Sequence, residues 1–454
     1  MSIEIVPSSV ITRTPPGPKP PPIVGFLPML RRDPLRFFTA MMMKYGDIVM
    51  LGKGWYFLSH PDYVRQVLQE NNRNYEKGVL VAPLKLLVGN GLLTSEGGFW
   101  LRQRRLAQPA FHHRRIADMA DTMVKLTDDM LGRWEKTHAR GQRFDVATEM
   151  MALTARIIGV TMFSTDVAGR TSDLYDALST TIHFVNRRSS SLVRLPLNVP
   201  IPKNQRFNKA LHVIDTLMLD VIADRRRSGE HTGDLLSMLM QATDADTGEQ
   251  MSDQQLLDEA KTIFLAGHET TANALAWAFV YLSRSPEVAR RLRDEVRAQL
   301  GDRTPTFADV AKLRYTRMVI DETLRLSPPA WSTVRTPLRD DVIGGYHIPA
   351  GSFITISPYV THRNPAFWPN PEGFDPERFN PDRQEDRPRF AYFPFGGGPR
   401  ICIGNSFALM EATLLLAMIC RRFQLDLVPG HPIDTLPEVT LRPRHGVLVT
   451  LRPA

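Results

Sequence analysis

The segment FPFGGGPRICIG, Phe393 to Gly404, places one of only two cysteines of the chain directly after three consecutive glycines. The residues that follow, NSFALMEATLLLAMICRRF, have the pattern of an apolar helix. A sulfur near the N-terminus of that helix feels the positive end of the helix dipole and free backbone N–H groups, which favour thiolate over thiol. The glycines allow a tight turn and the close approach of a flat ligand. The segment therefore predicts that a Cys402 thiolate faces a haem iron.

The second cysteine, Cys420, lies deep in the following apolar helix and is expected to be a core residue. Neither cysteine belongs to a CxxC pattern, which argues against a disulfide framework or a zinc site and fits a reducing cytoplasm. The N-terminus shows no basic leader with an apolar segment, and no run of about 18 apolar residues occurs elsewhere. We expect a soluble, cytoplasmic protein without a transmembrane anchor.

The net charge of +8 and the pI near 9.5 are compatible with nucleic-acid binding. However, basic residues alternate with acidic ones along the chain instead of gathering in one tail, so a protein partner with an acidic face fits equally well.

Helical periodicity dominates from about residue 34 to residue 325, with one strand-like segment, DIVMLGKGWYFLSH. After Pro328 the chain becomes proline-rich and strand-like before it ends in a helix and a strand. This pattern predicts a mainly α fold with minor β (α+β). The proline cluster Pro15 to Pro22 predicts an extended lead-in over residues 1–30, and the absence of repeats and linkers predicts a single domain over residues 31–454.

One long helix is predicted from Ser252, which has capping-box spacing to Gln255, to about Arg284, before Pro286 opens another helix. At about 1.5 Å per residue it is roughly 50 Å long and crosses the domain.

The hexapeptide AGHETT, Ala266 to Thr271, is unusual in the middle of such a helix. Gly267 costs about 1 kcal/mol relative to alanine, and Thr270 can donate its hydroxyl to the carbonyl of Ala266. We expect a local bulge and a small groove for a diatomic ligand and a water, with Glu269 and Thr270 relaying protons. The hexapeptide alone supports a mid-helix threonine and a surface glutamate equally well.

Three charged residues are candidates for a structural cluster. Glu322 and Arg325 are three residues apart on a helix that Pro328 stops, and such a pair is usually an exposed salt bridge. Arg378, in DPERF, could join them in a buried three-way cluster that pins an irregular loop.

Trp100 and Arg104, in GGFWLRQRRLAQPAFHHRR, are four residues apart and share a helix face. An indole N–H beside a guanidinium can clamp a carboxylate or phosphate. A nucleic-acid patch or a solvated basic face explains this segment about as well.

Taken together, these segments resemble the cytochromes P-450, the haem-thiolate monooxygenases, of the soluble bacterial type without a fused reductase. AGHETT is similar to the oxygen-activating helix of the family, and the ExxR, PERF and WxxxR segments occur in the family's order along essentially the whole chain. The haem-binding signature FxxGxRxCxG is matched by Phe395, Gly398, Arg400, Cys402 and Gly404.

The resemblance implies a cytochrome P-450 haem domain whose long central helix crosses a haem b, with Cys402 as the axial ligand of the iron. It implies that Phe395 packs near the sulfur, that Glu269 and Thr270 deliver protons to bound dioxygen, and that Ala266 and Gly267 belong to the cofactor-binding helix. The residues expected to bind the haem propionates are Trp100, Arg104, Arg335 and Arg400. The implied reaction inserts one atom of O2 into a C–H or C=C bond.

Peroxide-driven relatives carry an arginine and a proline in place of Glu269 and Thr270, so O2 and NAD(P)H-derived electrons are expected. No flavin domain follows residue 454, which implies that a ferredoxin or flavodoxin with its reductase supplies the electrons, and we expect a monomer. We expect this partner to dock on the basic residues Arg102, Arg105, Arg114 and Arg115.

By the same resemblance the substrate is a small apolar molecule such as a fatty acid, terpenoid or steroid. The pocket is expected to draw on residues 79–93, 184–201, 264–266 and 330–334. Arg187, Arg188 and Arg194 could hold a substrate carboxylate, although arginines in such a connection are more often solvated. Three alternatives stay open: a haem-thiolate sensor without turnover, a peroxide-driven hydroxylase, and a basic helical nucleic-acid binder without haem.

Overall fold

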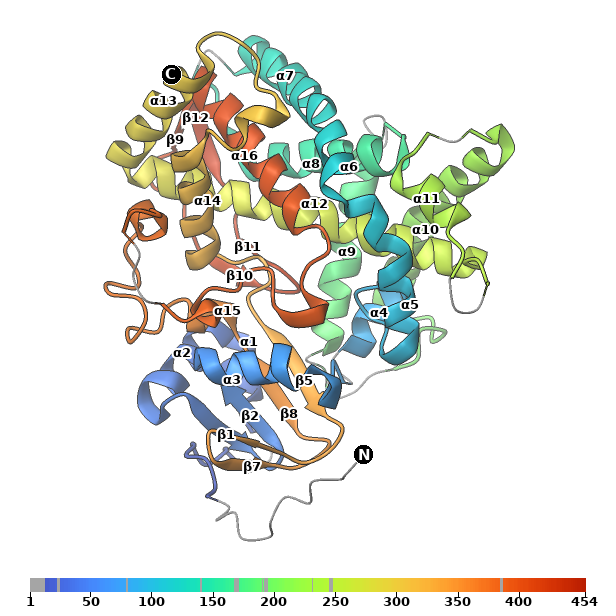
Figure 1. Cartoon of the computed structure of the whole chain (residues 1–454), viewed down its shortest axis with the longest axis vertical. Coiled ribbons are helices and arrows are strands. Elements are labelled where there is room, and N and C mark those ends of the chain that lie inside the picture. Colours follow the sequence, from blue (N-terminus) through green and yellow to red (C-terminus); the bar gives the residue numbers. More distant parts are fainter. Residues whose placement is uncertain are drawn as a thin grey trace. The chain divides into compact units, whose positions relative to one another are not determined.

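The structure of the chain is a computed structural model (Figure 1). It describes residues 13–22, 25–78, 81–138, 141–166, 171–189, 191, 195–230, 232–244, 248–383 and 387–454. The chain falls into two compact units, which are described separately. The first unit comprises residues 1–80, 332–371 and 386–401, and the second comprises residues 81–331, 372–385 and 402–454.

The first unit is built on a mixed sheet with the strand order β1-β2-β8-β5-β3. Strand β2 pairs in parallel with β8, and the other neighbours in this sheet are antiparallel. A separate antiparallel pair joins β6 and β7. The strands of this unit are β1 (Ile48–Gly52), β2 (Trp55–Leu58), β3 (Tyr75–Glu76), β5 (Thr333–Pro337), β6 (Asp341–Ile343), β7 (Tyr346–Ile348) and β8 (Phe353–Ile356).

Short helices accompany this sheet, and its buried branched side chains, such as Ile354 and Ile356, form the core of the unit. The proline-rich residues 14–20 form neither helix nor strand, and Pro16 O accepts a hydrogen bond from Met50 N at 2.9 Å, so this stretch lies along β1. The helices are α1 (Leu27–Arg32), α2 (Pro34–Tyr45), α3 (Pro61–Arg65), α15 (Pro358–Thr361), a π-helical turn at Gln66–Glu70 and 3-10 turns at Asn72–Asn74, Arg389–Ala391 and Gly398–Arg400.

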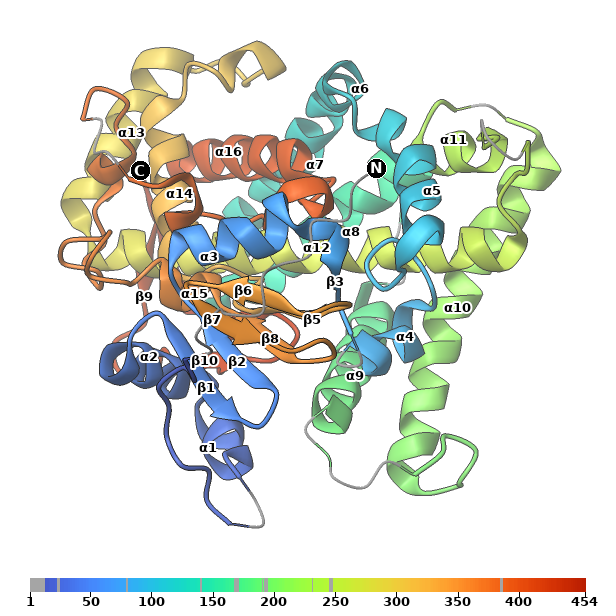
Figure 2. The same cartoon turned by 60° about the horizontal axis from the view of Figure 1, so that its bottom comes forward.

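The second unit is mainly helical, as Figure 2 shows. Its helices are α4 (Ala82–Val88), α5 (Gly97–Ala107), α6 (His113–Asp118), α7 (Ala120–Thr137), α8 (Val146–Phe163), α9 (Thr171–Ser189), α10 (Pro202–Ser228), α11 (Leu235–Gln241), α12 (Asp253–Arg284), α13 (Pro286–Leu300), α14 (Arg314–Leu326) and α16 (Asn405–Arg422). Strands β4 (Phe144–Asp145), β12 (Leu448–Pro453) and β9 (Phe423–Leu427) form one sheet in that order, and β10 (Thr435–Pro437) pairs with β11 (Leu441–Pro443). Short 3-10 turns lie at Gln108–Phe111, Phe307–Asp309 and Pro376–Phe379.

Helix α12 begins and ends as the sequence predicts. Ser252 Oγ accepts from Gln255 N at 3.3 Å, and Ser252 N donates to Gln255 Oε1 at 2.8 Å, which completes the capping box. The helix ends at Arg284, and Pro286 occupies the first turn of α13. Helices α8, α10, α14 and α16 all pack on α12, which makes it the central element of this unit (Figure 2).

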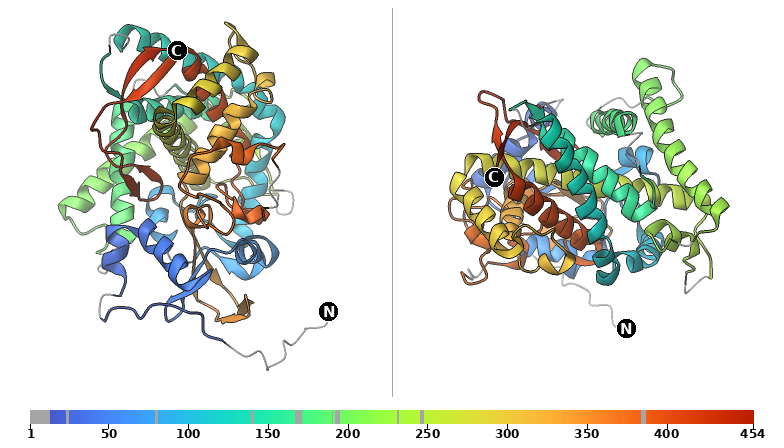
Figure 3. Two further views of the ribbon diagram at one scale, coloured as in Figure 1. Left: turned by 90° about the vertical axis from the view of Figure 1, so that its left-hand side faces the viewer. Right: turned by 90° about the horizontal axis from the view of Figure 1, so that it is seen from above.

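Helix α8 is long and apolar enough to cross a membrane by length and composition alone. In the second unit it packs on α12 and α7, among the helices that Figure 3 shows from two further sides. Most of this helix is buried. Its apolar character is therefore explained by its place in the core.

The prediction of a mainly α fold with minor β is confirmed, because helices dominate the described residues and the strands form small sheets. The predicted boundary at residue 30 stays a prediction. The predicted bulge within Ala266 to Thr271 is wrong, since α12 is a continuous α-helix there. The Thr270 hydroxyl bonds to the Ala266 carbonyl at 2.8 Å, as expected, and the helix accommodates this extra bond without a break.

Candidate active site

Cys402 lies in the second unit, just before the first turn of α16, whose N-cap is Gly404. The N–H of Gly404 donates a hydrogen bond to the sulfur, and the positive charge of Arg104 lies near it. The side chain is accessible, yet enough protein surrounds the sulfur that burial raises the pKa of the thiol above its usual range. The sequence predicted that the helix N-terminus would favour the thiolate of Cys402. In this structure desolvation raises the pKa of the thiol by more than the Gly404 N–H and the Arg104 charge lower it.

Trp100 and Arg104 lie on α5, one turn apart on the same face, and both are half-buried. Burial lowers the pKa of the Arg104 guanidinium, and the nearby Cys402 opposes that shift. The guanidinium stays charged, since an arginine is protonated at any physiological pH. The second unit thus brings an indole, a cation and a thiol into one region.

The middle of α12 is accessible at Ala266 and Thr270, whereas most of the helix around them is buried. Ala266 is exposed and Thr270 is half-exposed, whereas Leu265 and Thr271 are buried. Ala266 and Thr270 are four residues apart and share one face. The accessible face therefore consists of a methyl group and a hydroxyl, which leave room for a ligand against the helix.

Gly267 has a packing role in this same turn. A Cβ at Gly267 would lie 2.6 Å from both Cδ1 and Cγ1 of Ile158 on α8. The missing side chain lets α8 and α12 approach closely. This contact gives a structural reason for the glycine beside the cofactor role expected from the resemblance.

Glu269 is almost fully buried, although it lies only three residues after the exposed Ala266 on α12. Its Oε1 accepts a hydrogen bond from Thr440 Oγ1 at 2.5 Å, and Asn273 Nδ2 donates to the same hydroxyl at 3.2 Å. Burial raises the pKa of the Glu269 carboxyl, against the Thr440 hydrogen bond and the Arg442 charge, while Glu438 adds to the rise. The interpretation of this residue as a surface glutamate is wrong, and the carboxyl is suited to hold a proton.

Glu322, Arg325 and Arg378 are brought together in the second unit. Arg325 donates to Glu322 through Nε at 2.6 Å and Nη2 at 2.8 Å, and neither side chain has exposed surface. Arg378 Nε lies 3.5 Å from Glu322 Oε1. The cluster also holds the loop backbone, because Arg325 donates to Gly373 O at 2.9 Å and Glu322 accepts from Asp375 N at 2.8 Å.

The first unit carries Arg335, Phe395, Gly398 and Arg400. Arg335 is buried and donates to Thr333 Oγ1 at 2.9 Å and to Val334 O at 2.7 Å, while Phe395 and Arg400 are half-buried.

Gly398 has a φ of +64°, and a Cβ there would lie 1.9 Å from the carbonyl oxygen of Leu68. The room that Gly398 leaves is thus taken by the backbone of the π-helical turn Gln66–Glu70.

The donor set fits a haem. Cys402 is a free thiol, and in the described part of the chain no group of three or more His, Cys, Asp or Glu side chains could hold a metal ion. A single sulfur ligand, a nearby arginine and an open helix face suit a flat iron porphyrin and do not suit a zinc or carboxylate metal site.

A family model described as Cytochrome P450 matches residues 15–450. The chain belongs to the cytochrome P450 family. It is similar to cyclooctatin synthase from Streptomyces melanosporofaciens, with 41% identity over 92% of each chain. It is also similar to cyclooctat-9-en-7-ol 5-monooxygenase from the same organism, with 38% identity over 92% of this chain and 90% of the relative.

Pentalenene oxygenase from Streptomyces avermitilis is 33% identical over 90% of each chain. The resemblance drawn from the motifs is confirmed, and the protein is a cytochrome P450 monooxygenase. Family membership implies a haem b with cysteine thiolate ligation.

The basic surface predicted for a redox partner of this P450 is smaller than expected. Arg102 is largely buried, lies 3.7 Å from both Asp244 Oδ2 and Glu249 Oε2, and donates to Gln250 O. Arg105 lies 3.9 Å from Asp244 Oδ2. Asp244 and Glu249 therefore offset much of the charge of these two arginines, while Arg114 and Arg115 are exposed.

The segments expected to line the substrate pocket are only partly described. Val79, Leu80 and Arg194 lie outside the described residues. Phe184 on α9 stacks on Phe207 of α10 with ring centroids 4.2 Å apart. Arg188 lies 5.9 Å from the Phe184 ring and donates to Leu195 O at 2.8 Å, whereas Arg187 is exposed. Arg188 thus caps a loop carbonyl, and a carboxylate-binding role for it is less favoured.

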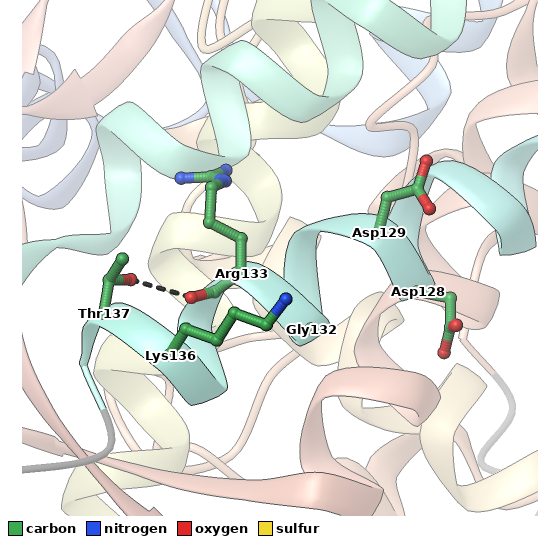
Figure 4. A pocket seen from close by; sticks show the side chains of 6 residues that line it. All are labelled: Asp128, Asp129, Gly132, Arg133, Lys136 and Thr137. Atoms are coloured by element: carbon green, nitrogen blue, oxygen red, sulfur yellow. Dashed lines mark hydrogen bonds between the residues drawn. The ribbon is translucent and has the colours of Figure 1, made fainter.

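Two hollows lie along α7, away from the predicted site residues. The larger, about 480 Å³, is lined by Asp128, Asp129, Gly132, Arg133, Lys136 and Thr137 (Figure 4). The second, about 390 Å³, lies between α7 and α8. In Figure 4 the Thr137 hydroxyl bonds to the Arg133 carbonyl, and the charged side chains of the first hollow spread apart, so this hollow is an open surface feature.

Sequence reasoning missed Asn273 and Thr440, which hold the acid of the site. Asn273 could have been found, because it lies one helical turn after Glu269. Thr440 gave no signal, since it is 171 positions away and precedes a short strand.

Proposed function

We propose that this cytochrome P450 inserts one oxygen atom of O2 into a C–H or C=C bond of an apolar terpenoid. The names of the Streptomyces relatives, among them a cyclooctat-9-en-7-ol monooxygenase and a pentalenene oxygenase, support the substrate class. The observation that carries the use of O2 is the adjacent pair on α12. Thr270 is accessible, and Glu269 is a buried acid with a raised pKa.

In this proposal Cys402, whose sulfur accepts the N–H of Gly404, would ligate the iron, and Phe395 and Gly404 of the same signature would contribute to the haem site. Ala266, which is exposed on α12, and Gly267 beside it would belong to the haem-binding surface. Gly398 shapes the loop through its positive φ. The residues proposed to bind the propionates are Trp100, Arg104, Arg335 and Arg400. When bound, the haem supplies the redox chemistry that activates dioxygen.

The protein side chains manage protons. The balance RH + O2 + 2e⁻ + 2H⁺ → ROH + H2O requires two protons at the site. The Thr270 hydroxyl donates to the Ala266 carbonyl and keeps its acceptor lone pairs, so it can accept a proton and release its own on the accessible face of α12, and Glu269, whose pKa burial raises, can supply that proton. Glu322, Arg325 and Arg378 serve a structural role by fixing the loop at Gly373 and Asp375.

We further propose a cytoplasmic monomer that receives electrons, originally from NAD(P)H, through a separate ferredoxin or flavodoxin and its reductase. The exposed Arg114 and Arg115 are the better docking candidates, because Arg102 and Arg105 already face Asp244. Charge reversal at Arg114 and Arg115 should slow electron transfer and weaken its salt dependence. Arg227→Glu on α10 is the matched control, and an equal loss in that variant would contradict the docking site.

The substrate proposal is tested by titrating apolar terpenoids, fatty acids and steroids into the purified haem protein and following the low-spin to high-spin change. Ligands that give this change are then turned over with ferredoxin, its reductase and NAD(P)H under ¹⁸O2. Incorporation of one ¹⁸O atom into a terpenoid is expected. A product labelled only from H2¹⁸O2 would favour the peroxide-driven alternative, and a spectral change without any product would favour a sensor.

A further inference from the structure

The carboxyl of Glu269 is held by a short polar chain whose hydrogen-bond direction can be deduced. Asn273 Nδ2 donates to Thr440 Oγ1, and Thr440 Oγ1 donates to Glu269 Oε1. All three side chains are more than nine-tenths buried, so bulk water does not compete for these bonds.

The hydroxyl of Thr440 has one hydrogen and two acceptor lone pairs. Because the amide nitrogen of Asn273 can only donate, it occupies a lone pair of the hydroxyl. The hydroxyl hydrogen is then free to point to Glu269 Oε1, and in the opposite arrangement it would be buried without an acceptor. A neutral Glu269 therefore receives this bond on its carbonyl oxygen.

The backbone that carries Thr440 is anchored independently of its side chain. Trp277 Nε1 of α12 donates to Leu441 O at 3.3 Å, and Trp331 Nε1 donates to Glu438 O at 2.9 Å. Leu441 N donates to Pro329 O at 2.9 Å. The turn between β10 and β11 is thus held on both sides of Thr440.

Charged groups near this turn are paired with one another. Glu438 accepts from Arg442 and lies 2.9 Å from His183 Nδ1 of α9. Their opposite effects on Glu269 partly cancel, since Arg442 favours its ionised form and Glu438 its neutral form. The hydrogen bond from Thr440 therefore determines the orientation of the Glu269 carboxyl.

We propose that Asn273 and Thr440 are positioning residues for Glu269, which direct its carbonyl oxygen toward the β10–β11 turn and place its proton on Oε2. Oε2 is the oxygen that is not engaged by this turn, so the proton stays available for transfer. The catalytic consequence rests on the proposed function of Glu269 as a proton donor. The placement of the proton on Oε2 does not depend on that proposed function, and it can be measured in the protein without turnover.

The test uses infrared difference spectra of the full haem protein between mildly acidic and alkaline pH. The carbonyl stretch of protonated Glu269 is assigned as the band that Glu269→Gln abolishes. Thr440→Val, which removes the hydroxyl and keeps the volume, should shift this band to higher frequency, because the carbonyl loses its donor. Thr440→Ser is the matched control and should leave the band in place.

Asn273→Ala should split or broaden the Glu269 band, because the freed Thr440 hydroxyl can then accept a bond from Glu269. Thermal unfolding of each variant shows whether it is folded, and Asn273→Ala keeps the test open if Thr440→Val does not fold. Three results would overturn the proposal. The first is that no infrared band depends on Glu269, and the second is that the band stays in place in both Thr440→Val and Asn273→Ala. The third is that Thr440→Ser shifts the band.

Turnover tests the consequence separately. Thr440→Val should lower kcat roughly tenfold and divert electrons to peroxide, which is less than the factor of about 10² to 10⁴ typical for loss of a general acid. Thr440→Ser, which keeps the hydroxyl, should have the kcat and the peroxide yield of the natural protein. A shifted infrared band with unchanged kcat would leave the placement of the proton intact and would contradict the proposed catalytic role of Glu269.

Discussion

Arg325 and Glu322 form an ion pair with two hydrogen bonds and no exposed surface. Removing one partner leaves a buried charge without compensation, which typically costs about 3–5 kcal/mol. We expect Glu322→Gln to lower the thermal midpoint strongly and to impair haem retention, because the loop at Asp375 loses its anchor as well.

The matched control is Glu287 with Arg290 on α13, which has the same spacing but is fully exposed. Glu287→Gln should leave the unfolding curve unchanged. Equal midpoints for the two variants would show that burial of the Glu322 cluster does not matter for stability.

Replacing Gly398 with alanine tests whether the loop before Cys402 requires a glycine at this position. Alanine there must adopt a φ of +64° and would place its Cβ against the Leu68 carbonyl. Gly54 also has a positive φ, but its Cβ position is open. Chemical unfolding should show a loss of about 1–2 kcal/mol for Gly54→Ala, from the left-handed backbone alone, and a larger loss for Gly398→Ala. A smaller loss for Gly398→Ala would refute the close approach.

Gly267 and Ile158 should be energetically coupled. Gly267→Ala is expected to destabilise the protein by about 1–3 kcal/mol, because its Cβ meets Ile158. Ile158→Ala opens that space, so the double variant should lose less than the sum of the single losses. Strict additivity in a double-mutant cycle would mean that the glycine serves another purpose, such as the cofactor face.

Glu411 on α16 is fully buried, and within the described chain neither of its carboxyl oxygens has a hydrogen-bond partner, although the Thr271 hydroxyl lies close enough to favour the ionised form slightly. Burial raises the pKa of this carboxyl well above its ordinary value, so the folded protein binds a proton that the unfolded chain releases. The stability from this group is complete below the unfolded pKa and decreases as pH rises toward the folded pKa, by at most about 1.4 kcal/mol per pH unit.

As the pH rises through this range, the free energy of unfolding of the natural protein should fall. The free energy of unfolding of Glu411→Gln should fall less steeply. The exposed Glu230→Gln serves as the control and should follow the natural protein. Identical slopes for Glu411→Gln and the natural protein would mean that Glu411 is ionised in the fold.

Local signals in the sequence were sufficient for much of the fold. The capping box at Ser252, the end of α12 at Arg284 and the proline that opens α13 are each specified by residues a few positions apart. The buried three-way cluster of Glu322, Arg325 and Arg378 was foreseen as a possibility, but the loop atoms that it holds, Gly373 O and Asp375 N, were not, since they depend on how the loop packs against the helix.

Contacts between distant segments were beyond the sequence. Thr440 meets Glu269 across 171 positions, and the Leu68 carbonyl fills the space that Gly398 leaves. The raised pKa of Cys402 was missed for a related reason. The helix terminus is visible in the sequence, but the desolvation that outweighs it is a property of the assembled fold.

The central claim, that Cys402 is the thiolate ligand of a haem, is tested most directly by the absorption spectrum of the reduced protein under carbon monoxide. The natural protein and Cys420→Ser, which alters only the buried second cysteine, should both show the red-shifted Soret band of a thiolate-ligated haem. Cys402→Ser should lose that band. A red-shifted band that persists in Cys402→Ser, or its absence from the natural protein, would contradict the claim.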